Sequence, residues 1–315
     1  MKTILLLNHK EHACGVYQWG FRTNEIILFS KKYQFLYSEV TREDEFRELV
    51  KEITPDAVIY NYHPATMPWL NPSLLDEFRI YKPVVIIHEG FAHPENEHSF
   101  DYYIYIDPAM DIEPNWSHKV FKVGRPLLKY NGEHPKTDVV TVGSFGFGFA
   151  NKRYELIVRQ VNKEFDNAVI NLLIPFATFG DSMGDAARLS VEKCRQEITK
   201  PGIKLNVTHE LLPEEDVLKF LAGNDINAFF YEEMLGRGAS SATDYALSVN
   251  RPIIVSDTYM FRHITRNTLL PITFDKVSIQ QAILNGTKVL QPLYDRWTHE
   301  NYIKDFEEIF DEILR

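Results

Sequence analysis

Short apolar runs recur along this chain, and each is followed by a turn and then by a polar stretch with helical spacing. This alternation is typical of parallel strands joined by crossover helices, because helices cover both faces of such a sheet and its strands are apolar throughout. The fold class is therefore α/β. We predict strands at residues 3–7, 26–29, 57–60, 84–88, 102–106, 119–123, 139–142, 168–174, 204–207, 228–230 and 252–255.

The polar stretches predict helices over 41–53, 152–164, 213–222 and 241–249, and a terminal amphipathic helix over 297–314. A length of 315 residues exceeds what one hydrophobic core usually serves, so two domains are expected. Turn-forming residues cluster at 124–138, where we place the linker. The expected domains are 1–130 and 131–296, and the terminal helix, 297–315, either closes its own domain or crosses back to the first.

The charge balance argues against a nucleic-acid-binding face, because the formal net charge is −10 at pH 7 and phosphate neutralisation needs clustered Lys and Arg. Cys14 and Cys194 are the only cysteines, too few for a disulfide framework, which favours a reducing compartment. No stretch approaches the ~20 apolar residues of a transmembrane helix. We expect a cytoplasmic protein with no transmembrane segment, and the sequence leaves its oligomeric state open.

Two glycine-containing loops follow predicted strands and precede predicted helices. Gly15 and Val16 lie in the first, where the backbone could approach a ligand or simply form a turn. The second runs from Gly143 to Lys152 and includes Ser144. Glycine lets backbone N–H groups face a phosphate, a helix N-terminus adds positive potential, and Lys152 supplies a full charge. We predict a phosphate site there, against the alternative of a turn with a solvated lysine.

A third segment of small residues, 236–245, runs into a predicted helix and is a candidate second anion site. Arg237 could form a forked bond to a diphosphate, and Ser240 or Ser241 could donate a hydrogen bond. The alternative is a serine-capped helix beside an exposed arginine.

His88 ends a predicted buried strand, so we expect it at the strand-end cleft, where ligands bind in parallel α/β sheets. His63, His93 and His98 compete with it for any catalytic role. The spacing of these histidines matches no closed ligand set, so no metal site is predicted.

Over nearly its whole length the chain resembles the GT-B glycosyltransferases, especially the large retaining group that uses nucleotide sugars, glycosyltransferase family 4-like. The resemblance rests on Cys14-Gly15-Val16, the strand ending in His88, the loop from Gly143 to Lys152, and the block from Glu232 to Asp257. It implies two Rossmann-like doubly wound domains facing a central cleft. It also implies a catalytic position for His88 beside the transferred sugar, and a donor-diphosphate site formed by Gly15, Val16, Ser144, Lys152, Arg237, Gly238, Ala239 and Ser240.

The sequence departs from this family at its paired glutamates, because Arg237 occupies the first position and Tyr245 the second. Asp244 is one residue from the second position, and Glu232 or Glu233 lies upstream of the first. The donor nucleoside and ribose are therefore assigned to Glu232, Asp244 and Tyr245 together, and which carboxylate holds the ribose stays open.

The resemblance implies a glycosyltransferase that moves a sugar from a nucleotide-diphosphate donor to a hydroxyl of a glycan or lipid-linked acceptor, in polysaccharide, lipopolysaccharide or other glycan synthesis. Retention of configuration and independence of metal are implied with it. The nucleotide sugar is a substrate, and no cofactor is expected. The alternatives are a GT-B nucleotide-sugar epimerase, which would turn over without an acceptor, and a non-catalytic protein that binds nucleotide sugars or glycans.

Overall fold

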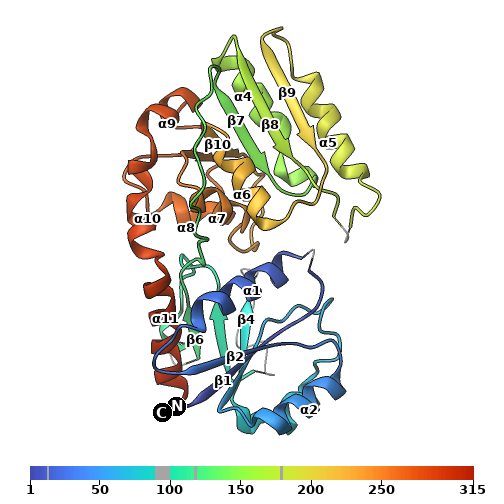
Figure 1. Ribbon diagram of the computed structural model, residues 1–315, viewed down its shortest axis with the longest axis vertical. Helices are drawn as coiled ribbons and strands as arrows, with labels where there is room; N and C mark the ends of the chain where they lie inside the picture. The colour runs from blue at the N-terminus through green and yellow to red at the C-terminus, as the bar shows by residue number, and fades with distance from the viewer. Residues whose placement is uncertain (13, 89–99, 117–118, 178–179) are drawn as a thin grey trace. The chain divides into compact units, whose positions relative to one another are not determined.

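The computed structural model describes residues 1–12, 14–88, 100–116, 119–177 and 180–315 (Figure 1). The chain forms two compact units. Unit 1 comprises residues 1–126, 236–239 and 296–315, and unit 2 comprises 127–235 and 240–295. The first change between units thus falls at Pro126–Leu127, where the sequence predicted 130–131, and the final return to unit 1 begins at Arg296.

Unit 1 is built on a sheet of six described strands, all paired in parallel, in the order β2-β1-β3-β4-β5-β6. The strands are β1 (Thr3–Asn8), β2 (Gln34–Glu39), β3 (Ala57–Tyr60), β4 (Pro83–Ile87), β5 (Tyr102–Tyr105) and β6 (Val120–Lys122). The helices are α1 (Gly15–Ile27), α2 (Glu43–Ile53), α3 (Pro72–Glu77) and α11 (His299–Ile313). The predicted α/β class is confirmed.

The strand predicted at 26–29 is wrong. Ile26 and Ile27 form the buried last turn of α1, whereas Leu28 and Phe29 follow the helix and are exposed. Adjacent apolar residues at the end of a helix and in the turn after it imitate a short buried strand. The second strand is β2 instead.

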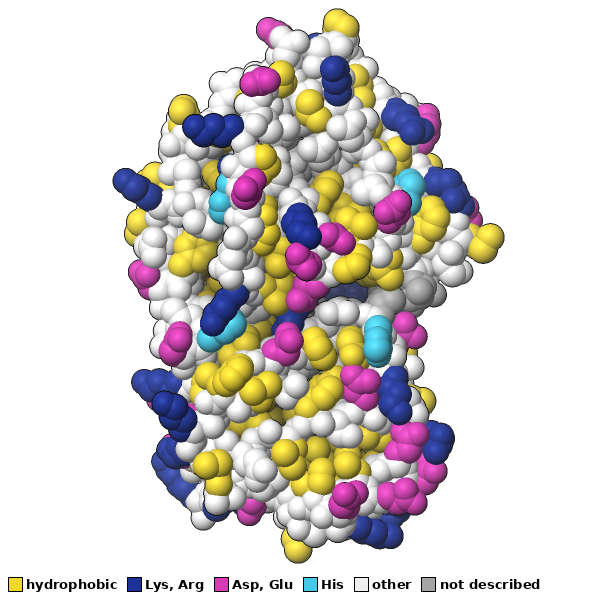
Figure 2. Space-filling model, in the orientation of Figure 1, with side chains coloured by type: hydrophobic (Ala, Val, Ile, Leu, Met, Phe, Trp, Pro, Cys, Tyr) yellow, Lys and Arg dark blue, Asp and Glu magenta, His cyan; other side chains and the backbone are white. Residues whose placement is uncertain are grey.

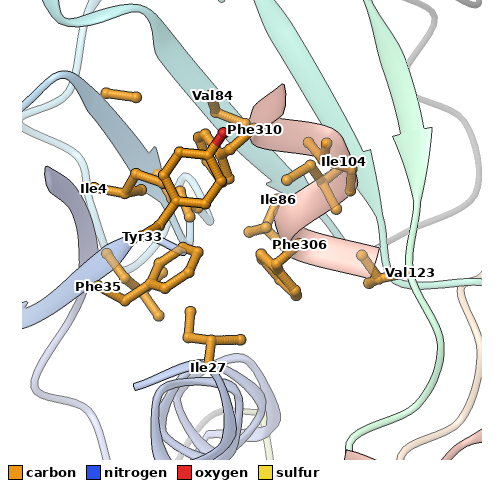
Figure 3. Packing of buried hydrophobic residues seen from close by; sticks show 14 of the residues in the cluster. Ile4, Ile27, Tyr33, Phe35, Val84, Ile86, Ile104, Val123, Phe306 and Phe310 are labelled. Carbon is orange, nitrogen blue, oxygen red and sulfur yellow. The ribbon is translucent and has the colours of Figure 1, made fainter. Parts of the chain in front are cut away.

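The strands of unit 1 bury side chains on both faces of the sheet, because successive residues point to opposite sides. Ile4 and Leu6 face the cluster that contains α1 and α11, whereas Leu5 and Leu7 face the cluster that contains α2 and α3. In Figure 3 the rings of Phe306 and Phe310 from α11 lie among aliphatic side chains of the sheet. The terminal helix therefore completes the core of unit 1, as the resemblance implied.

Unit 2 carries a second parallel sheet, with five described strands in the order β11-β10-β7-β8-β9. The strands are β7 (Thr141–Phe145), β8 (Ala168–Leu173), β9 (Ile203–Thr208), β10 (Ile226–Phe229) and β11 (Ile253–Val255). The helices are α4 (Tyr154–Glu164), α5 (Asp185–Gln196), α6 (Glu214–Ala222), α7 (Ala242–Ser248), α8 (Arg262–Thr265), α9 (Ile279–Asn285) and α10 (Gln291–Arg296).

Strand β7 begins and ends later than the predicted 139–142. Gly143, Ser144 and Phe145 pair with Asn171, Leu172 and Leu173 of β8, so they belong to the sheet and not to the loop. The connection that follows is therefore shorter than predicted and contains a 3-10 turn at Ala150–Lys152 before α4.

A row of asparagine amides crosses the sheet of unit 2. Asn206 on β9 donates to Asn171 on β8, Asn171 donates to Asn224, and Asn224 donates to Asn227 on β10, at 3.0, 2.8 and 3.2 Å. Gly143 on β7 lies in this row, and a Cβ placed on it would be 2.0 Å from Asn224 Nδ2. Any side chain at residue 143 would therefore clash with the asparagine amides of this row.

On the face shown in Figure 2, acidic and basic side chains are interspersed over each unit. Within the described residues, no helix has both the length and the apolar character that crossing a membrane requires.

Candidate functional site

Polar side chains gather in unit 1 where the strand order reverses. Strand β1 lies between β2 and β3, and in open parallel sheets ligands bind outside the carboxyl ends of the strands at such a switch point. Asn8 ends β1, Asn61 directly follows β3 and His88 directly follows β4. These residues and the first turn of α1 form the unit 1 cluster.

Two buried asparagines connect this cluster. Asn61 Nδ2 donates to Asn8 Oδ1 at 2.9 Å and to the Val16 carbonyl at 2.7 Å. Asn8 Nδ2 donates to the Tyr17 carbonyl at 3.0 Å, and Asn8 Oδ1 accepts from the His9 N–H at 3.0 Å. Asn8 and Asn61 are fully buried, so these bonds satisfy amides that would otherwise be costly to bury.

His88 is half-buried at the edge of this network. Its Nε2 lies 2.6 Å from Asn61 Oδ1, and the Trp19 ring packs edge-on against the imidazole at 5.4 Å between centroids. Loss of hydration on burial, together with a smaller effect of the Arg125 charge, lowers the pKa of His88 to about 3. His88 is therefore neutral at physiological pH.

His9 is a second neutral imidazole in the unit 1 cluster. It is 1% exposed, and its Nδ1 accepts from the Glu11 N–H at 3.1 Å. Its Nε2 is buried and has no hydrogen-bond partner among the described residues. Burial lowers the pKa of His9 to about 4, so Nε2 carries the proton and is a donor.

Gly15 and Val16 form the first turn of α1, and Cys14 is the residue that caps it. The Cys14 side chain makes no capping hydrogen bond to this helix terminus, and Gly15 is exposed. Unsatisfied N–H groups at the positive end of a helix dipole are a favourable place for an anion. Gly15 and Val16 are thus placed where they could bind the donor diphosphate, the role that the resemblance implies for them.

Unit 2 has its own switch point, between β7 and β10, and Lys152 lies there. Its Nζ is 3.7 Å from the centroid of the Tyr231 ring, and Tyr231 lies two residues after the end of β10. The Asn151 carbonyl accepts from the Glu232 N–H at 2.8 Å, which ties the loop after β7 to the loop after β10. Lys152, Tyr231 and Glu232 therefore form one group, the unit 2 cluster.

The start of the β7–α4 loop is shaped around two tyrosines. Gly146 has φ +143°, a conformation that favours glycine, and its carbonyl accepts from the Tyr154 hydroxyl at 2.6 Å. Tyr231 is 3% exposed, and its hydroxyl has no partner among the described residues. A buried phenol next to a cation and a glycine backbone is a ready hydrogen-bond donor for an anionic ligand.

Several residues assigned to the donor site have other roles. Ser144 is fully buried in β7, and its hydroxyl donates to the Ala228 carbonyl at 2.7 Å. The Ser240 N–H donates to the Met260 carbonyl at 3.3 Å. The Ser144 hydroxyl is therefore engaged inside the sheet, and its assignment to the donor site stays a prediction.

Asp244 and Tyr245, which the sequence assigned to the nucleoside, are buried in α7, and their assignment stays a prediction. Asp244 is 0% exposed. Tyr245 packs edge-on against Phe145 at 5.4 Å, and its hydroxyl lies 3.4 Å from Glu214 Oε2. Glu232 is exposed beside Lys152, so of the assigned carboxylates only Glu232 is placed to meet a ligand.

The segment 236–245 is divided between the two units. Arg237, Gly238 and Ala239 belong to unit 1, whereas Ser240 belongs to unit 2, and Arg237 is exposed. The predicted second anion site is therefore not a single group within either unit.

Among the described residues, no group of three His, Cys, Asp or Glu side chains is arranged to hold a metal ion. His93 and His98, which competed with His88 in the sequence, lie outside the described residues. His63 is described, and its Nδ1 accepts from the Ala65 N–H at 3.2 Å.

Sequence reasoning missed Asn8, Asn61, His9 and Tyr231. Each lies at or just after the carboxyl end of a strand, next to a switch point of its sheet. That position was the available signal for Asn61 and Tyr231, which directly follow the predicted strands at 57–60 and 228–230.

Two Rossmann-like parallel α/β units, with a terminal helix that returns to the first, define the GT-B class of folds. Solved glycosyltransferases share this fold with the chain. One from Rickettsia africae ESF-5 aligns with a TM-score of 0.70 and 11% identity, over 100% of this chain and 99% of that one. AviGT4, involved in avilamycin A biosynthesis, aligns with a TM-score of 0.60 and 10% identity, over 100% and 98%.

TarM of S. aureus, solved with fondaparinux, α-GlcNAc-glycerol and UDP, aligns with a TM-score of 0.55 and 12% identity, over 84% of this chain and 58% of TarM. No protein-family model and no curated protein matches the sequence. The predicted GT-B fold is thus confirmed by structure, at identities where sequence similarity has disappeared.

Proposed function

We propose that this protein is a glycosyltransferase that moves a sugar from a nucleotide-diphosphate donor to a hydroxyl acceptor. The observation that carries the proposal is the unit 2 cluster, where Lys152 lies beside Tyr231 and Glu232 at the switch point of the sheet. A lysine next to a glycine-containing loop and an exposed carboxylate offers a cation for a diphosphate and an acceptor for ribose hydroxyls. The GT-B fold supports the same function.

In this proposal Lys152 and backbone N–H groups stabilise the negative charge that develops on the leaving diphosphate. The Tyr231 ring face is a weaker partner for an ammonium group than a diphosphate is, so the lysine is available to the donor. Because these groups supply the stabilising charge, we include independence of metal and of any separate cofactor in the proposal. We include retention of configuration and a role in glycan synthesis on the resemblance alone.

A second candidate function is non-catalytic binding of nucleotide sugars. It is favoured by Tyr245, which stands where the family has a glutamate and is packed against Phe145 instead of facing a ligand. This protein would bind donor nucleotides but would neither transfer nor hydrolyse the sugar.

Thermal shift with UDP, GDP, ADP, CMP and their common sugar conjugates tests the proposal, because a ligand that binds only the folded state raises the melting temperature. We expect one nucleoside diphosphate and its sugar conjugates to stabilise the protein. Replacing Lys152 with Ala should weaken that binding about tenfold to a hundredfold, since a hydrogen bond to a charged group is worth about 1.5–3 kcal/mol.

Lys163→Ala is the matched control, because Lys163 is an exposed lysine of α4 and should leave the affinity unchanged. Sugar transferred from the selected donor, or released by hydrolysis, establishes an enzyme, and conversion of the donor to an epimeric sugar without an acceptor identifies the epimerase alternative. Binding without turnover supports the second candidate. No stabilisation by any of these nucleotides, or equal loss in both lysine variants, contradicts the donor site.

A further inference from the structure

The orientation of the Asn61 amide is fixed by a backbone carbonyl. Its Nδ2 lies 2.7 Å from the Val16 carbonyl, which can only accept a hydrogen bond. With the amide rotated by half a turn, two oxygens would face each other at that distance. The nitrogen must therefore point to Val16, and Asn61 Oδ1 must point to His88 Nε2, 2.6 Å away.

The Asn8 amide is fixed in the same way by two backbone groups. Its Oδ1 accepts from the backbone N–H of His9, and its Nδ2 donates to the backbone carbonyl of Tyr17. Asn8 Oδ1 is thus an acceptor for the second Asn61 N–H, at 2.9 Å. Both hydrogens of the Asn61 amide are committed, and only its oxygen remains for the histidine.

An acceptor next to Nε2 requires a proton on that nitrogen. We propose that Asn61 is a positioning residue that holds His88 as the Nε2–H tautomer, so that Nδ1 is an unprotonated acceptor for a hydroxyl of the bound sugar. Among the described residues no hydrogen bond reaches Nδ1. Gly20 makes the arrangement possible, because a Cβ there would lie 2.4 Å from Asn61 Nδ2.

This inference rests on the proposed function for the identity of the ligand, but the tautomer does not. A neutral imidazole with a lone pair on Nδ1 attracts a hydroxyl group and repels a phosphate oxygen. It also has no proton at Nδ1 to give to a leaving group. His88 therefore recognises the sugar and does not serve as a general acid through Nδ1.

The tautomer is read from the long-range ¹H–¹⁵N spectrum of the histidine rings in the ¹⁵N-labelled full chain. The peaks of His88 are assigned by their loss in His88→Gln. We expect the Nε2–H pattern for His88 at neutral pH. His209 is an internal reference of the opposite kind, because its Nδ1 lies 2.8 Å from the Ile174 carbonyl and must carry the proton. A wild-type spectrum with a proton on Nδ1 of His88, or with both tautomers populated, overturns the proposal.

Asn61→Asp tests the role of Asn61 itself. A carboxylate at the same place favours the doubly protonated imidazolium, so the His88 peaks should move to that pattern near neutral pH. Asn206→Asp, which adds the same charge in unit 2, should leave the His88 peaks unchanged. An unaltered His88 pattern in folded Asn61→Asp excludes the positioning role. Should Asn61→Asp fail to fold, the wild-type spectrum decides alone.

A binding measurement separates this inference from the proposed function. The probes are UDP-glucose and UDP, or the corresponding pair for the base that the thermal shift selects. His88→Ala, which leaves the Asn61–Val16 hydrogen bond in place, should lower the affinity for the nucleotide sugar about tenfold and leave the bare diphosphate unaffected, because one neutral hydrogen bond is worth about 0.5–1.5 kcal/mol. Equal loss for both probes contradicts sugar recognition by His88, whereas binding of neither probe by wild type contradicts the proposed function and leaves the tautomer result standing.

Discussion

Gly143 carries no side chain at the point where the Asn224 amide passes strand β7. A Cβ there would lie 2.0 Å from Asn224 Nδ2 and 2.6 Å from Asn227 Oδ1. Both asparagines are almost fully buried, so their amides cannot turn to water instead. The residue type at 143 is therefore set by a hydrogen-bonded row of side chains and not by backbone conformation.

We expect Gly143→Ala to lower the free energy of unfolding by about 1–3 kcal/mol, because the added methyl group displaces buried amides from their partners. Urea unfolding followed by far-UV circular dichroism measures the change. Gly223→Ala is the control, since the nearest atoms to a Cβ there are at 3.4 Å, an ordinary contact. Equal stability of Gly143→Ala and wild type would show that the asparagine side chains can move away from the added methyl group without losing stability.

Helix α11 combines a defined start with an aromatic face. The Thr298 side chain accepts from the Asn301 N–H at 3.1 Å and caps the first turn. Tyr302, Phe306 and Phe310 follow at helical spacing and enter the core of unit 1. The helix is thus held both by its cap and by the sheet that it covers.

Replacing Thr298 with Ala should cost unit 1 about 1 kcal/mol, the usual worth of a side-chain cap. Thr298→Ser keeps the hydroxyl and should retain most of that stability. Tryptophan fluorescence during urea unfolding is the measurement, because all four tryptophans, at positions 19, 69, 116 and 297, belong to unit 1. Identical midpoints for the Ala and Ser variants would mean that packing alone fixes the helix.

Elements with a strong local pattern were predictable, and those decided by distant contacts were not. Strand 57–60 and the aromatic spacing of α11 follow from hydrophobic period alone. The structure of residues 26–29 could not be predicted in this way. Tertiary contacts decide whether a short apolar run forms a helix that packs on a sheet or a strand within it. Lys152 was recognisable from its loop, whereas Asn61 reaches Asn8, Val16 and His88 only after three strands and α1 have assembled.

At the scale of the whole molecule, the two neutral histidines make the stability of unit 1 depend on pH. The pKa of His9 is lowered from 6.5 to about 4 and that of His88 to about 3, both mainly by burial. Below pH 6.5 the unfolded chain binds protons that the folded chain does not. Their contribution is therefore complete above that pH and is lost as the pH falls towards the folded values.

We expect the unfolding free energy of unit 1 to fall between about pH 6.5 and about pH 5 by up to about 1.4 kcal/mol per pH unit for each histidine. Urea unfolding monitored by tryptophan fluorescence at several pH values gives this slope. The double variant His9→Gln, His88→Gln should have a flatter profile over the same interval, whatever its absolute stability. If these substitutions left the slope unchanged, groups other than His9 and His88 would take up the protons on unfolding.

The return of α11 to unit 1 has a consequence for the order of synthesis. Phe306 and Phe310 leave the ribosome after every residue of unit 2, although they complete a core whose first strand is Thr3–Asn8. Domains tend to fold as units while the chain is made. All of unit 2 is therefore available to fold before α11 is made, while one apolar face of the unit 1 sheet stays without that helix until α11 emerges.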